Sequence, residues 1–319
     1  MDFALTQQAR EILSPYVPVS RMVHSPGLSG ATGAEVYLKL ENEGPTGSFK
    51  TRGAIYTLWR RMQSGPLPGV VTSSTGNHGA ATAYAARRLD VPAAIFLPEG
   101  PNPVKRALIA REGAHIVEAG KFLEESRQHA AQHAREKGWH LVVDGEDEHL
   151  TAGASTIGCE IVEQAPSVDI ILVPVGDSSL IRGTAFAAKH GKSKVQVVGV
   201  VADRAPAYYR SWKERRAVST ESSDTIADGL AVRATVEANV RQLLELVDDM
   251  RMVTDDEMLR AMYHLLVEEH VVAEPAGAAA TAALVKSGRQ FAGKKVVLLV
   301  TGANVPPELL RRALNLASS

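Results

Sequence analysis

The sequence has one cysteine, few aromatic residues and no excess of charge of either sign. A single cysteine excludes an internal disulfide and any multi-cysteine metal site. The 35 basic and 36 acidic residues give a formal net charge of −1, whereas a nucleic-acid partner calls for a basic surface. No apolar run approaches the roughly 18 residues of a membrane span, and the N-terminus lacks the pattern of a signal peptide. We therefore expect a cytoplasmic globular protein with neither a membrane nor a nucleic acid as partner.

The 319 residues have room for one large or two medium domains. Short apolar, β-branched runs alternate with segments of helical spacing, and most runs are continuously apolar, which is typical of strands buried on both faces. The expected strands are 35–41, 69–74, 93–98, 115–118, 140–144, 169–175, 195–202 and 295–300. The expected helices are 51–64, 78–89, 103–112, 121–137, 151–165, 180–190, 256–270 and 276–287. This alternation predicts an α/β protein with parallel sheets.

The turn at 42–52 places a lysine at the start of a helix. Pro45 and Gly47 end the preceding strand, Ser48 is a candidate helix cap, and Lys50 follows in the first turn. A cation there opposes the helix dipole, and such a local inconsistency indicates function. The turn is not a phosphate-binding P-loop, because Phe49 separates the lysine from the glycine and serine before it.

Three further strand-to-helix turns concentrate polar side chains and glycines. The segment SSTGNHG at 73–79 combines hydroxyl and amide donors with two glycines, which favours a cradle for a carboxylate or a phosphate. The segment VGDSSLIRG at 175–183 has the position of a phosphate loop but only two glycines. The segment TGAN at 301–304 ends an expected central strand, and EPAG at 274–277 begins a helix. Ligands of open α/β sheets bind at such carboxyl ends of strands.

Five segments, in this order along the chain, carry a family resemblance: TGSFKTRGA, SSTGNHG, TIADGLAV, EPAGA and VTGANV. The sequence resembles the pyridoxal-phosphate enzymes of the tryptophan-synthase-β fold, nearest to the threonine/serine dehydratases and serine racemases. The resemblance spans nearly the whole chain. It implies two open, twisted, mostly parallel sheets, with a large domain at 1–68 and 147–319 and a small mobile domain at 69–146.

The resemblance also implies roles for individual residues. Lys50 would bond covalently to the aldehyde of pyridoxal 5'-phosphate and later act as the base at the substrate's Cα, with Phe49 beside the pyridine ring and Asn77 on the phenolic oxygen. The phosphate would be held by Gly176, Asp177, Ser178, Ser179 and Leu180. Thr301 would face the pyridine nitrogen, where a neutral hydroxyl favours loss of a β-substituent over transamination.

The substrate carboxylate is expected to bind to the segment SSTGNHG at 73–79. Ser73, Ser74, Thr75 and the backbone around His78 would bind it, and Thr75 would also be the catalytic hydroxyl on the face opposite the lysine. Serine racemases carry serine at the position of Thr75 and many dehydratases carry alanine, so both activities stay open. Arg127 is a candidate for a second substrate carboxylate, and a solvated surface arginine is the alternative.

The phosphate loop and the place of the metal in metal-activated relatives both depart from the family pattern. Relatives carry consecutive glycines where this chain has Asp177-Ser178-Ser179, and a carboxylate beside a phosphate is repulsive. We expect either that Asp177 turns away or that Arg182 offsets its charge. Metal-activated relatives carry acidic residues at positions that match Val201 and Ala207, so we expect no metal at that place.

These observations predict a homodimeric ammonia-lyase that dehydrates and deaminates a small hydroxy amino acid such as L-threonine or L-serine. A racemase or a β-replacement enzyme of the same fold is the nearest alternative. A non-catalytic protein that binds an amino acid or the cofactor is a remote one.

Overall fold

The structure is a computed structural model that describes residues 2–74, 76–101 and 103–317. The chain divides into two compact units. Of the described residues, the larger unit comprises 19–43 and 154–317, and the smaller unit comprises 2–18 and 44–153. The expected mobile domain at 69–146 lies inside the smaller unit; its separate movement stays a prediction.

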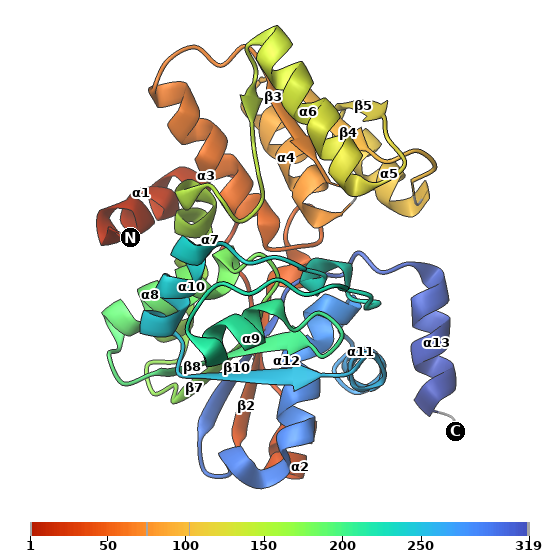
Figure 1. Cartoon of the computed structure of the whole chain (residues 1–319). Coiled ribbons are helices and arrows are strands. Elements are labelled where there is room, and N and C mark those ends of the chain that lie inside the picture. The colour runs from red at the N-terminus through yellow and green to blue at the C-terminus, as the bar shows by residue number, and fades with distance from the viewer. Residues whose placement is uncertain (1, 75, 102, 318–319) are drawn as a thin grey trace. The chain divides into compact units, whose positions relative to one another are not determined.

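The larger unit is built on a six-stranded sheet with the order β1-β2-β10-β7-β8-β9 (Figure 1). Its strands are β1 Met22–His24, β2 Glu35–Leu40, β7 Ile170–Pro174, β8 Gln196–Ala202, β9 Asp249–Val253 and β10 Lys295–Val300. Strand β1 pairs antiparallel with β2, and all other pairs are parallel. Alternate residues of the central strands pack with α2, α11, α12 and α13 into one apolar core. Buried strands of this kind explain the continuous apolar runs in the sequence.

The smaller unit holds a four-stranded parallel sheet with the order β5-β4-β3-β6. Its strands are β3 Val70–Ser73, β4 Ala93–Leu97, β5 His115–Glu118 and β6 His140–Leu141. Along β4, Ala94 and Phe96 pack with helix α6, whereas Ile95 and Leu97 pack with α4 and α5. Because side chains alternate along a strand, these helices cover opposite faces of the sheet.

The helices follow the strands closely, as parallel pairing requires. In the larger unit they are α2 Pro26–Thr32, α8 Ser179–Gly191, α9 Ala207–Glu214, α10 Glu237–Leu246, α11 Asp255–Val267, α12 Pro275–Ser287 and α13 Pro307–Ala317. In the smaller unit they are α1 Phe3–Leu13, α3 Lys50–Gln63, α4 Asn77–Arg88, α5 Pro103–Arg111 and α6 Leu123–Lys137. Helix α7 Glu148–Gln164 begins in the smaller unit and ends in the larger one. Within the described ranges no helix has the length and apolarity needed to cross a bilayer.

The predicted α/β class and the two mostly parallel sheets are confirmed. All eight expected strands and all eight expected helices are present, with ends that move by a few residues. Two local expectations were wrong. The strand expected at 140–144 pairs only at His140–Leu141, which leaves Asp144 beyond its end. Ser48 does not cap α3, because the residue before the helix is Phe49 and no side-chain cap bond forms there.

Candidate functional site

Lys50 is the first residue of the 14-residue helix α3. Its Nζ donates to both carboxylate oxygens of Asp144, at 2.8 Å and 2.7 Å. The amine also lies 5.2 Å from the centre of the Phe49 ring. With a side chain that is 14% exposed, Lys50 is largely shielded from water. The lysine that the sequence singled out is therefore held at a helix start by a carboxylate from a distant segment.

The sequence analysis missed Asp144 as a site residue. It follows β6 and the short segment after it, so it lies near the carboxyl end of a parallel strand, where open α/β sheets bind ligands. An acidic residue at such a strand end was the available signal. It was hidden because residues 140–144 read as one continuous strand.

The SSTGNHG segment joins β3 to α4, as predicted. Asn77 is the first residue of α4, and the backbone N–H of Gly76 donates to Oγ of Ser74 at 3.3 Å. The hydroxyl of Ser73 bonds to Ser126 of α6 at 3.0 Å, so it is engaged within the small sheet. Thr75 lies outside the described residues.

His78 lies one residue into α4 and is buried. Its Nδ1 lies 3.5 Å from Oδ1 of Asp144. Asp144 therefore has the lysine amine on one side and an imidazole ring on another. The structure brings Lys50 and His78 together around this carboxylate, with Phe49 beside the lysine amine, all within the smaller unit.

In the larger unit, the segment at 176–179 forms the turn between β7 and α8. A Cβ on Gly176 would lie 2.1 Å from the carbonyl oxygen of Gly229, so only glycine fits at that point. Ser178 has φ of +78°, a left-handed conformation that favours glycine. The loop therefore keeps the backbone shape of a glycine-rich loop although serine replaces glycine.

Asp177 uses its carboxylate within this loop. Oδ1 accepts from the backbone N–H of Ser179 at 2.8 Å. The hydroxyl of Ser179 is buried and has no hydrogen-bond partner in the described part of the chain. Because it lies at the first turn of a 13-residue helix, where an anion is favoured, this hydroxyl is a ready donor to a phosphate.

Arg182, on helix α8, stabilises the loop through hydrogen bonds of its guanidinium group. Its Nε donates to Oγ of Ser178 at 3.1 Å and its guanidinium donates to Gln242 at 3.1 Å. Burial lowers the pKa of Arg182 from its ordinary value, while Tyr208 and Asp177 oppose that shift. Burial also raises the pKa of Tyr208, whose hydroxyl donates to the carbonyl oxygen of Asp177 at 3.1 Å. The charge of Asp177 acts on Arg182, as the expected offset requires, but the choice between the two expectations for Asp177 stays a prediction.

Four of the sequence segments converge in the larger unit. A Cβ on Gly277 would lie 2.5 Å from the carbonyl oxygen of Gly302, and the backbone N–H of Glu274 donates to that same oxygen at 2.9 Å. Gly229 lies against Gly176 and against Ala276. The segments VGDSSL, TIADGL, EPAGA and TGAN therefore meet at the carboxyl ends of β7 and β10. Thr301, directly after β10, is buried at this place.

Three other positions named in the sequence analysis were considered for metal ligation or for substrate binding. Val201 in β8 and Ala207 at the start of α9 are buried apolar residues. Arg127 is exposed on α6, in agreement with the alternative of a solvated surface arginine. No group of three or more metal-ligating side chains occurs among residues 2–74, 76–101 and 103–317.

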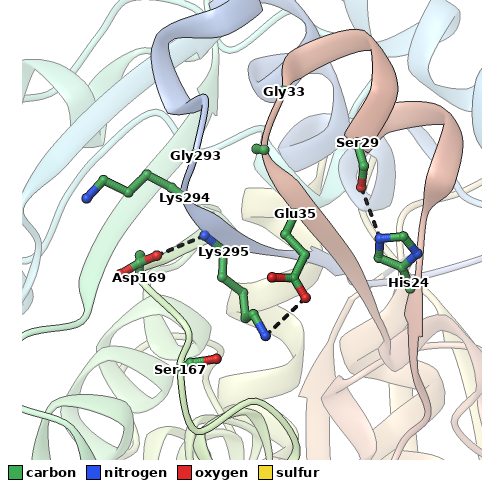
Figure 2. A pocket seen from close by; sticks show the side chains of 10 residues that line it. His24, Ser29, Gly33, Glu35, Ser167, Asp169, Gly293, Lys294 and Lys295 are labelled. Atoms are coloured by element: carbon green, nitrogen blue, oxygen red, sulfur yellow. Dashed lines mark hydrogen bonds and ion pairs between the residues drawn. The ribbon is translucent and has the colours of Figure 1, made fainter.

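A hollow of about 560 Å³ lies at the opposite end of the larger sheet (Figure 2). Its lining comes from the beginnings of β2, β7 and β10, away from the segments that carry the motifs. Two of the charged side chains there, Lys295 and Glu35, pair with each other at 3.0 Å, and the backbone N–H of Lys295 donates to Asp169 at 2.8 Å. None of the described residues of the motifs lines the hollow. This hollow is therefore not the candidate site.

Known proteins match this chain over most of its length. A profile of the family described as pyridoxal-phosphate dependent enzyme matches residues 13–302. An L-threonine ammonia-lyase of Thermotoga maritima is 34% identical over 309 residues, which cover 97% of this chain and 77% of that protein. The catabolic L-threonine dehydratase TdcB of Staphylococcus aureus is 33% identical over 94% of this chain and 88% of its own.

Solved structures match the whole fold. A maize serine racemase gives a TM-score of 0.92 at 28% identity, covering 98% of this chain and 97% of that one. The processed form of threonine deaminase isoform 2 from Solanum lycopersicum gives 0.92 at 28% identity, covering 100% of this chain and 89% of that one. Together with the lysine turn and the converging loops, these similarities place the chain in the family of pyridoxal-phosphate dependent enzymes, with the type II fold.

Proposed function

We propose that this protein is an ammonia-lyase that dehydrates and deaminates a small β-hydroxy amino acid, L-threonine or L-serine, to a 2-oxo acid and ammonia. The observation that carries the proposal is the shielded amine of Lys50 at the head of α3, 2.7 Å from a carboxylate oxygen. Relatives named L-threonine ammonia-lyase and L-threonine dehydratase, alike over at least 94% of this chain, support the choice of substrate class.

The side chains fit the cofactor in their chemistry. Lys50 supplies the amine for the covalent bond to the aldehyde, and Phe49 and Asn77 would contact the ring and its phenolic oxygen. The phosphate would be held by Gly176, Asp177, Ser178, Ser179 and Leu180. Three features of this loop suit a phosphate: the positive φ of Ser178, the close packing of Gly176 against the carbonyl oxygen of Gly229, and the Ser179 hydroxyl, which has no partner among the described residues. Bound pyridoxal phosphate supplies an electron sink for a negative charge at the substrate's Cα.

The protein's residues would then orient the substrate and move its protons. Ser73, Ser74, Thr75 and the backbone at His78 would bind the carboxylate, although the bond of Ser73 to Ser126 leaves Ser74 as the better donor. The amine of Lys50, freed by the substrate, would remove the Cα proton. Thr301 would offer the pyridine nitrogen a neutral hydroxyl, which supports loss of the β-hydroxyl over transamination.

Other properties of the enzyme follow from the same proposal. Residues 69–146 would move as a small domain that excludes water around the substrate. The enzyme would be a cytoplasmic homodimer that works without a metal at the place of Val201 and Ala207. Thr75 would act as the hydroxyl opposite Lys50, a role that also leaves racemisation of serine open.

A substrate panel tests the activity. Purified protein with pyridoxal phosphate is mixed with the isomers of serine, threonine and hydroxyaspartate, and oxo-acid release is measured. We expect turnover of L-threonine or L-serine at the highest rate. D-serine formation without pyruvate would instead identify a racemase, and a new product only in the presence of a thiol would identify a β-replacement enzyme. A yellow protein without any turnover would contradict the proposal and favour a binding protein.

A further inference from the structure

Asp144 contacts the lysine through both of its carboxylate oxygens. The two distances to Nζ of Lys50 are 2.8 Å and 2.7 Å, and the side chains of Lys50 and Asp144 are 14% and 30% exposed. Charge-assisted bonds of this length are the stronger class of hydrogen bond, and partial burial protects them from screening. The pair is therefore more than a contact between two solvated surface charges.

Helix α3 explains why a carboxylate is needed at this point. A cation in the first turn of a helix opposes the helix dipole, and a negative charge there is favourable. The first turn of α3 contains no acidic residue, and its N-cap Phe49 makes no side-chain cap bond. Asp144, from the segment after β6, supplies the missing negative charge.

The neighbouring Asp147 has a different task. It accepts from the backbone N–H of His149 at 2.8 Å and lies 3.0 Å from that residue's Nδ1. These local bonds hold the segment that leads into α7. The bonds of Asp144 run to α3 instead, 94 residues away in sequence.

We propose that Asp144 is a positioning residue for Lys50, whose carboxylate holds the lysine amine in place whenever that amine is not bonded to the cofactor. The proposal rests on the proposed function, because it takes Lys50 as the residue that bonds to the cofactor. It adds a partner for that lysine at a place where the sequence motifs indicated none.

The pairing has two chemical consequences. An opposite charge within about 4 to 6 Å favours the protonated amine, and only a neutral amine attacks an aldehyde. Asp144 therefore shifts capture of the aldehyde toward higher pH. During turnover, the Cα–H bond breaks, its electron pair stays on the substrate and the proton moves to Nζ. Asp144 then stabilises the ammonium so formed, which makes Lys50 a better base.

One titratable group beside the pair is His78 of α4, whose Nδ1 lies 3.5 Å from Oδ1 of Asp144. Farther along the chain, Asp147 and His149 bond to each other. A protonated His78 would add a second positive charge beside Asp144 and weaken its hold on the amine. The pH profile of the His78→Gln variant separates this contribution from that of Asp144.

The test follows adduct formation, independently of turnover. The full chain, freed of cofactor, is mixed with pyridoxal phosphate between pH 6 and pH 10. The adduct is measured by its absorbance and, after borohydride reduction, by mass spectrometry of the Lys50 peptide. We expect the pH midpoint to fall by roughly one unit in Asp144→Asn and to stay near the wild-type value in Asp144→Glu. Glu146→Gln, which neutralises an exposed carboxylate two residues away, should leave the midpoint unchanged.

The possible failures are distinguishable. If the wild-type protein forms no adduct on Lys50, the proposed function fails. If wild type forms the adduct and Asp144→Asn has the same midpoint, the positioning role is overturned. If Asp144→Asn does not fold, Asp144→Ser provides the same loss of charge with a smaller side chain. Should neither neutral variant fold while Glu146→Gln does, Asp144 is a residue for stability and the positioning role is likewise overturned.

Discussion

The backbone N–H of Ser179 donates to Oδ1 of Asp177 at 2.8 Å. The carboxylate thus occupies a donor at the start of α8, where family members with glycine would leave the donor available to a phosphate. A bound phosphate must compete with Asp177 for this N–H or bind beside it. Asp177 would therefore weaken the proposed phosphate site, and Arg182 would reduce the effect.

We expect Asp177→Asn to bind pyridoxal phosphate more tightly. Two unit charges about 4 Å apart repel by roughly 4 kcal/mol at an effective dielectric constant near 20. Solvent and Arg182 reduce this, so we expect an increase in affinity of about tenfold, or about 1.4 kcal/mol. The measurement is a titration of cofactor-free protein. Pyridoxal, which lacks the phosphate, should bind both proteins equally, and the exposed Asp203→Asn serves as control. An unchanged affinity would mean that Asp177 does not face the phosphate.

Ser179→Ala should have the opposite effect. The buried Ser179 hydroxyl has no partner within the described residues, so its removal leaves no group of the protein unsatisfied. A lost hydrogen bond to a charged group costs about 1.5 to 3 kcal/mol, so we expect cofactor affinity to fall by at least tenfold. The midpoint of thermal unfolding without cofactor should hardly change. A large loss of unfolding stability, with cofactor affinity intact, would assign the hydroxyl to the fold instead.

Gly79→Ala should disrupt the SSTGNHG segment. A Cβ at Gly79 would lie 2.5 Å from the carbonyl oxygen of Ser74, a backbone atom that cannot move aside cheaply. We expect a loss of about 1 to 3 kcal/mol in the free energy of unfolding and a larger relative loss of turnover, because the displaced loop holds the proposed substrate donors. Gly30→Ala is the control, since nothing lies within 4 Å of its new Cβ. Wild-type stability in Gly79→Ala would contradict the close packing of this turn.

Stability should fall as the pH falls through the ordinary range of histidine, partly because of His140. Burial lowers the pKa of His140 from its ordinary value of 6.5, against an opposing effect of Asp147. Below pH 6.5 the unfolded chain therefore binds a proton that the folded chain binds only at lower pH, and this difference favours unfolding. Denaturant unfolding at several pH values measures the slope. His140→Phe should flatten it, whereas the exposed His129→Gln should not; equal slopes in all three proteins would contradict the assignment.

Much of the fold could be predicted because its strands are buried on both faces. The runs DIILVPV and KVVLLV indicated β7 and β10 directly, and their polar ends located the loop at 176–179 and Thr301. The two edge strands of the larger sheet, β1 and β9, escaped this reasoning. Strand β9, with the sequence DMRMV, lies at an edge of the larger sheet and carries charged residues, so it had no continuous apolar signal.

The residues of the candidate site could be predicted where a single sequence segment identifies them, but contacts between distant segments could not. Lys50 was recognised because a cation at the start of a helix opposes the helix dipole. In the structure, the carboxylate of Asp144 compensates for this unfavourable interaction. The contact between Lys50 and Asp144 joins residues that are 94 positions apart in sequence, and no local sequence pattern predicts such a contact. The hydrogen bond from the backbone N–H of Ser179 to the Asp177 carboxylate likewise depends on the conformation of the loop, whereas the sequence reveals only the composition of that loop.

Reduction of the cofactor adduct with borohydride, followed by peptide mass spectrometry, tests the role of Lys50 most directly. Protein supplied with pyridoxal phosphate should become yellow and carry the reduced pyridoxyl group on the peptide that contains Lys50. Lys50→Ala should bind the cofactor without that covalent mark and lose nearly all turnover. A colourless wild-type protein, or a mark found only on other lysines, would contradict the assignment of Lys50 and the mechanism built on it.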